Sequence, residues 1–170
     1  LHKELDDHGV RLLLHTNVQA ITEEGVTVDQ NGTQKSYPAD AVVLAIGVFP
    51  ETRLAAAAGL EIGKSGAIHV NENYQTSDPD IYAVGDAVEV YDPQTHGWRK
   101  LALAGPAQFE ARAAADHICG VASQNHGFAG ALCLRVFGQN AAAVGINEAL
   151  AARSGFHADS VMIFPGDKVG

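Results

Sequence analysis

The sequence is poor in positive charge and has no long apolar run. Lysine and arginine number 11 among 170 residues, against 20 aspartates and glutamates, so the formal net charge is −9. This balance disfavours binding to nucleic acid or to an anionic membrane surface. No apolar stretch has the length of a membrane span, and no signal peptide is visible. We therefore expect a cytoplasmic protein without a nucleic-acid or membrane partner.

Cysteine is also scarce, and metal-ligand patterns are missing. The two cysteines, Cys119 and Cys133, are too far apart for a CxxC redox pair. Because free cysteine is usually buried, we expect two inert thiols in the core. His96 has no histidine or carboxylate partner at metal-binding spacing, so we predict no metal site. With 46% hydrophobic and 18% charged residues, the chain is predicted to fold around a core.

The first 47 residues predict a helix, a small meander and a buried strand. Apolar spacing indicates a helix over 1–8, and strands are expected over 10–15, 18–22 and 26–29. Asn31-Gly32 between strand-like runs is a strong hairpin signal. The run AVVLAI at 41–46 is typical of a strand buried on both faces of a parallel sheet. Gly47 then lets the chain turn, either as a plain strand-to-helix connection or beside a ligand.

The most informative stretch is TSDPDIYAVGDA at 76–87. Residues 81–84 read as a short buried strand that stops at Gly85-Asp86. In open α/β sheets, ligands sit at the carboxyl ends of the strands. An ionised aspartate there can accept hydrogen bonds from the hydroxyls of a sugar or polyol. The alternative is that Gly85-Asp86 only ends the strand and caps the next segment.

Downstream of this stretch we expect a surface excursion, a helix and a second group of strands. Residues 88–100 contain turn dipeptides, and LALAGP opens a helix that runs to about His117, with Pro106 in its first turn. A helix start can stabilise an electron-rich ligand edge; the alternative is an ordinary core helix. After a polar linker at 120–130, the pattern predicts strands over 133–137, 141–146 and 161–164. Between the last two strands we expect a helix over 148–154, capped by Asn147.

Taken together, these motifs resemble the pyridine nucleotide-disulfide oxidoreductase family. The stretch at 76–87 looks like that family's second flavin-binding motif. LALAGPA and VFGQNAAAVGINEAL are most similar to its coenzyme A-disulfide reductase and NADH oxidase branch. The resemblance implies an α/β fold of partial FAD- and NAD(P)-binding domains, Rossmann-like and three-layered, followed by the start of an α+β dimerisation domain. It places residues 1–47 in the NAD(P)-binding domain, 48–122 in the FAD-binding domain and 123–170 in the dimerisation domain.

The resemblance also implies roles for individual residues. Asp86, with Gly85 before it, would hold the ribityl chain of FAD. Leu103, Ala104 and Gly105 would contact the flavin ring, and Gly47 would lie near the NAD(P) dinucleotide. No GxGxxG occurs, and neither cysteine matches the family's redox cysteine, so we assign no catalytic residue here. Because the chain begins with Leu1 inside a helix, we expect a C-terminal piece of a longer enzyme.

The activity implied for the full-length enzyme is transfer of hydride from NAD(P)H to FAD, and then of electrons to a cysteine and a small disulfide or peroxide substrate. Coenzyme A-disulfide reductase is the first choice, and NADH oxidase or peroxidase is an alternative. A ferredoxin or rubredoxin reductase shares the Gly-Asp motif. A non-catalytic α/β interaction module is the alternative from another class. The chain alone is expected to be inactive, to bind neither cofactor tightly, and to form a homodimer or strand-exchanged dimer.

Overall fold

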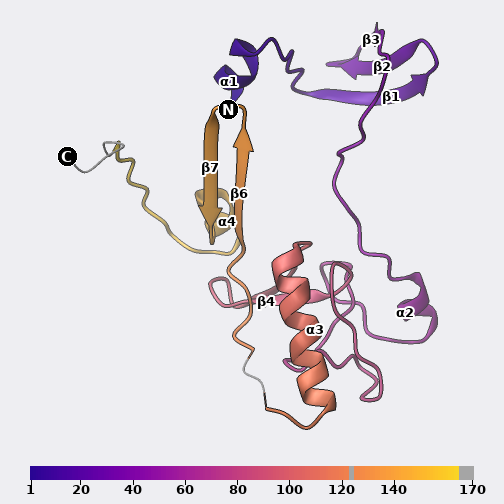
Figure 1. Cartoon of the computed structure of the whole chain (residues 1–170), viewed down its shortest axis with the longest axis vertical. Coiled ribbons are helices and arrows are strands. Elements are labelled where there is room, and N and C mark those ends of the chain that lie inside the picture. The colour runs from indigo at the N-terminus through magenta and orange to yellow at the C-terminus, as the bar shows by residue number, and fades with distance from the viewer. Residues whose placement is uncertain (123–124, 165–170) are drawn as a thin grey trace. The chain divides into compact units, whose positions relative to one another are not determined.

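The computed structural model describes residues 1–122 and 125–164 and shows a mixed α/β chain (Figure 1). The chain divides into two compact units. The first comprises residues 1–47 and 133–142, and the second comprises 48–132 and 143–170. The assignment of 1–47, 48–122 and 123–170 to three family domains stays a prediction. None of the described helices combines the length and apolar character needed to cross a bilayer.

The first unit contains the predicted helix and meander. Helix α1 (His2–Asp7) is followed by strands β1 (Thr16–Thr22), β2 (Gly25–Gln30) and β3 (Thr33–Tyr37), which form an antiparallel sheet in chain order. Asn31 and Gly32 both have positive φ, at 54° and 79°. This conformation suits a two-residue turn between β2 and β3. The hairpin predicted from Asn-Gly is therefore confirmed.

The second unit contains a hairpin where the sequence predicted an irregular excursion. Strand β4 (Glu89–Asp92) pairs antiparallel with β5 (Gly97–Lys100). The Asp92 carboxylate is fully buried, and its Oδ2 lies 2.8 Å from Nε of Arg99 on the facing strand. Oδ1 accepts from the N–H of Gln94 at 2.8 Å and so orders the turn. The turn predicted from these dipeptides is present, but the sequence did not predict the strands on either side of it.

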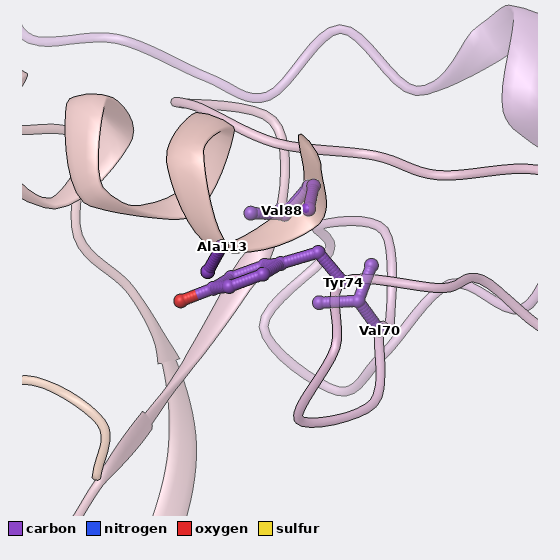
Figure 2. Close-up of a cluster of buried hydrophobic side chains, with 5 residues drawn as sticks. Val70, Tyr74, Val88 and Ala113 are labelled. Atoms are coloured by element: carbon purple, nitrogen blue, oxygen red, sulfur yellow. The ribbon is translucent and has the colours of Figure 1, made fainter. Parts of the chain in front are cut away.

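The core of the second unit lies under its long helix. Helix α3 (Ala104–Ile118) packs Ala113 and Ala114 against Val70, Tyr74 and Val88. Figure 2 shows the Tyr74 ring running past Ala113, with Val70 and Val88 beside it. The small alanine side chains let the helix approach the loops closely, and the tyrosine ring fills the space beneath it. A short helix, α2 (Arg53–Ala57), precedes this core in the chain.

The last described elements are a hairpin and a capped helix. Strands β6 (Ala131–Val136) and β7 (Gln139–Val144) form a two-stranded sheet, and helix α4 (Glu148–Arg153) follows. Oδ1 of Asn147 accepts from the N–H of Leu150 at 2.9 Å, which is the bond expected of an N-cap. The predicted strand–turn–strand–helix order is confirmed here.

Four predicted strands are wrong. Residues 10–15, 41–46 and 161–164 have no regular structure, and 81–84 contributes only an isolated bridge from Tyr82 to Gln75. The apolar side chains of 41–46 and 161–164 are exposed, and Val43, for example, is 88% exposed. In 81–84, by contrast, Tyr82 and Ala83 are partly buried against the core. A strand needs a neighbour for its N–H and C=O groups, and a parallel strand needs one that is distant in sequence. Among the described residues, 10–15, 41–46 and 161–164 have no neighbouring strand. The 81–84 segment has only a nearby partner: the N–H of Ala83 donates to Tyr74 O, and Ile81 O accepts from the N–H of Thr76.

The expectation of buried cysteines is also wrong. Cys119 directly follows the last residue of α3, and Cys133 lies on β6; both are exposed and neither forms a disulfide. Strand β6 is exposed along most of its length within the described part of the chain, so Cys133 has no core to enter.

Candidate functional site

Gly85 and Asp86 lie at a tight turn that follows the 76–84 segment. Gly85 has φ +90°, a conformation that favours glycine, and its carbonyl accepts from the N–H of Val88 at 3.1 Å. The far side of the turn is anchored to Ile68, which donates to Ala87 O at 2.8 Å and accepts from the N–H of Glu89 at 2.9 Å. The turn is therefore held at a fixed place on the core, and the Asp86 residue at its tip is exposed.

A buried carboxyl group from α3 holds the other side of this turn. Oε2 of Glu110 accepts from the backbone N–H of Gly85 at 2.6 Å, and Glu110 is only 1% exposed. The same helix is bonded a second time to this segment, since the Tyr82 hydroxyl lies 2.7 Å from Nδ1 of His117. Helix α3 and the 82–85 segment are thus joined at two points.

The order of the two contacts gives the direction of the helix along the segment. Glu110 contacts Gly85, and His117, farther along the helix, contacts Tyr82, which comes earlier in the segment. The helix and the 82–85 segment therefore run in opposite directions.

The first turn of α3 carries the other three residues predicted to contact flavin. Leu103 is the N-cap residue in an extended conformation, and Ala104 and Gly105 begin the helix. Within the described part of the chain, no side chain caps this end, so its N–H groups keep free hydrogen-bonding capacity. Ala104 and Gly105 are exposed, and a Cβ built on Gly105 would meet no described atom within 4 Å.

The five residues predicted for FAD therefore fit a flavin in their chemistry. Asp86 offers an exposed carboxylate acceptor, and the α3 start offers backbone donors with little side-chain bulk. A Cβ built on Gly85 would also find open space, so the turn presents backbone to solvent. Polyol hydroxyls are donors to a carboxylate, and a flavin ring has acceptor edges for N–H groups. The second unit thus contains both kinds of contact on one connected scaffold.

Gly47, the residue predicted for NAD(P), belongs to the first unit. It has φ +87° at the end of the exposed 41–46 segment, and a Cβ built on it would meet no described atom within 4 Å. The positive φ confirms that the chain turns there, as expected from a glycine after an apolar run. The structure does not relate Gly47 to the Gly85–α3 arrangement, so its proposed role is independent of that geometry.

The electrostatics of the site centre on Glu110. Burial raises the pKa of its carboxyl group, the N–H of Gly85 opposes that shift, and the charge of Asp86 adds to it. Burial also raises the pKa of Tyr74 to about 12; the charge of Glu110 contributes, and the hydrogen bond from Asn125 opposes it. Burial therefore opposes ionisation of both groups.

Sequence reasoning missed Glu110. A usable signal was present, because Glu110 is three and four residues before Ala113 and Ala114 and so shares their helix face. A carboxylate on the apolar face of a core helix requires a partner, and the backbone of a nearby turn is the natural donor. Among the described residues, no group of three or more histidine, cysteine, aspartate or glutamate side chains is placed to hold a metal ion.

Comparison with known proteins assigns the chain to a family. Residues 1–111 match the family model described as pyridine nucleotide-disulphide oxidoreductase. A curated NADH oxidase of Streptococcus pneumoniae is 33% identical over 156 residues, which are 92% of this chain and 34% of that protein. The chain therefore spans about a third of the length of this relative.

Two solved structures are similar in both fold and sequence. The structure of reduced Bacillus anthracis CoADR-RHD has a TM-score of 0.83 and 39% identity, covering 92% of this chain and 28% of that one. An NAD-dependent persulfide reductase from A. fulgidus has a TM-score of 0.82 and 36% identity, covering 90% and 28%. The predicted family and its coenzyme A-disulfide reductase and NADH oxidase branch are confirmed, as is the partial α/β, Rossmann-like class. This chain belongs to the pyridine nucleotide-disulphide oxidoreductase family.

Proposed function

We propose that this chain supplies the ribityl-binding and ring-facing elements of an FAD site in an NAD(P)H oxidoreductase. The observation that carries the proposal is the connection of the Gly85-Asp86 turn to α3 through Glu110. It joins the two elements to which the family resemblance assigns flavin contacts. Asp86 would accept from the ribityl hydroxyls, and Leu103, Ala104 and Gly105 would face the ring.

The chemistry of the whole protein is part of the same proposal. FAD, when bound, would take up hydride from NAD(P)H and pass electrons to a cysteine outside this chain. Gly47 would lie near the dinucleotide, and the protein would act as a cytoplasmic homodimer. Reduction of coenzyme A disulfide is the activity we favour, because LALAGPA and VFGQNAAAVGINEAL resemble that branch and the CoADR-RHD structure is 39% identical. The name of the Streptococcus relative favours NADH oxidase as the second candidate.

The flavin site can be tested in this chain by titration with FAD, followed by flavin fluorescence. We expect weak binding, with a dissociation constant on the order of 10–100 μM, because only part of the cofactor meets its site. Asp86→Ala should weaken binding at least about tenfold, as loss of a charged hydrogen-bond acceptor costs about 1.5–3 kcal/mol. Asp80→Ala is the matched control, since it removes an exposed aspartate from the same segment. It should leave binding unchanged.

Two results would contradict the flavin proposal. One is equal binding by the Asp86→Ala and Asp80→Ala variants. The other is no binding up to millimolar FAD, which would favour a non-catalytic interaction module. The choice of substrate needs the whole protein: anaerobic oxidation of NADH that depends on coenzyme A disulfide supports the reductase, and its absence favours the oxidase.

A further inference from the structure

We propose that Glu110 is a positioning residue for the flavin, because its buried carboxyl group fixes the Gly85-Asp86 turn against α3. This inference rests on the proposed function and adds to it a residue that contacts no predicted part of the cofactor. Its role would be to set where Asp86 stands relative to the first turn of the helix, the place to which the ring contacts are assigned.

The geometry singles out Glu110 for this role. Its Oε2 lies 2.6 Å from the Gly85 nitrogen, and the residue is 1% exposed, so bulk water does not compete for the bond. Placing a carboxyl group in a core without compensation is expensive. An alanine or leucine would pack this helix face at lower cost. The carboxyl group is therefore best explained by the backbone N–H that it receives from the turn.

The bond also acts at the right position in the chain. Gly85 immediately precedes Asp86, so fixing its N–H restrains the Val84–Gly85 peptide at the start of the turn that carries the aspartate. The other α3 bond to this segment, from His117 to Tyr82, is three residues farther back and restrains the segment rather than the turn. Removing Glu110 should thus leave the helix attached while freeing the Gly85 side of the turn.

Neighbouring groups shift the pKa of Glu110 in opposite directions. Burial and the charge of Asp86 raise the pKa of its carboxyl group, whereas the hydrogen bond from the Gly85 N–H lowers it. Both the ionised and the neutral carboxyl group keep an oxygen that can accept from this N–H. The positioning role therefore follows from the contact itself and does not require one protonation state.

The experiment compares Glu110→Gln with Glu110→Ala in the whole chain, using riboflavin as the probe. Glutamine keeps an oxygen acceptor without a titrating proton, whereas alanine removes the acceptor. We expect riboflavin binding to weaken at least tenfold in Glu110→Ala and less than threefold in Glu110→Gln. Gln108→Ala, an exposed change on the same helix, is the control.

A second readout separates this inference from the flavin proposal. The exchange of the Gly85 amide hydrogen, measured by NMR without ligand, should accelerate at least tenfold in Glu110→Ala and stay slow in Glu110→Gln. Fast exchange in the unaltered chain overturns the positioning role. So does a folded Glu110→Ala variant that binds riboflavin normally, or a Glu110→Gln variant as weak as Glu110→Ala. Slow exchange with no riboflavin binding by the unaltered chain contradicts the flavin site instead, while the bond to the turn stands.

Discussion

The core beneath α3 and the apolar segment at 41–46 have similar hydrophobic composition and opposite outcomes. Val70 and Val88 are almost fully buried, whereas Val43, Leu44 and Ile46 are largely exposed. The core residues lie in loops and in a helix that close on one another within 45 residues. The 41–46 segment has no paired strand beside it among the residues described. Hydrophobicity alone therefore does not decide which residues are buried. An apolar segment is buried where another described part of the chain packs against it.

The same contrast separates the antiparallel hairpins from the predicted parallel strands. Strands β1–β3, β4–β5 and β6–β7 each pair with a neighbour that is joined by a short turn. Parallel pairing needs a long crossover and so depends on distant parts of a chain. This chain spans about a third of the length of the Streptococcus relative. Three of the predicted strands would need neighbours that are distant in sequence. They are the segments at 10–15, 41–46 and 161–164.

The largest expected effect comes from removing the ring at the centre of the core. Tyr74→Ala should lower the free energy of unfolding by about 3–5 kcal/mol, because it deletes a buried aromatic side chain and leaves a cavity. Val43→Ala should change it by less than about 0.5 kcal/mol, since Val43 is exposed. Urea unfolding followed by circular dichroism measures both. Similar losses of stability for the two variants would mean that 41–46 is packed in solution. The contrast between this segment and the core beneath α3 would then be wrong.

The sequence correctly predicted elements whose partners are near in the chain, and it failed for elements whose partners are distant. The Asn31-Gly32 hairpin, the α3 helix and the Asn147 cap were correct, because each depends on residues a few positions apart. Strands whose neighbours are distant were assigned from their apolar runs alone and are absent. At the site, Asp86 and the α3 start were proposed from family motifs. Glu110 was missed because its partner is a backbone N–H 25 residues away.

A smaller effect is expected on self-association through the exposed segment. If 41–46 pairs as a strand with a second copy, two lysines there should oppose it by charge repulsion and by loss of apolar burial. The double change Val43→Lys with Ile46→Lys should raise the dissociation constant at least about tenfold, because burying each side chain is worth about 1.5–3 kcal/mol. Sedimentation velocity across a concentration series measures this. The control is Lys35→Ala with Arg11→Ala, which changes charge elsewhere in the same unit.

A monomer at every concentration would contradict that prediction, and so would equal association by the lysine variant. Either result would show that an exposed apolar run need not recruit a second copy. The 41–46 segment would then be exposed both within the chain and between chains. Reduced association together with unchanged unfolding in urea would strengthen the contrast, because it would show that 41–46 acts between chains and the Tyr74 core acts within one.

The smallest effect concerns a helix stabilised by its nearest neighbours. Asn147→Ala removes the oxygen that accepts from the N–H of Leu150 and should cost about 1 kcal/mol. Asn147→Asp retains the acceptor and adds a charge favourable to the helix start, so it should match or exceed the original stability. Chemical shifts of residues 148–153 report the helix directly. If both variants lose α4 equally, its formation depends on distant packing after all, and the distinction between local and distant partners does not extend to this helix.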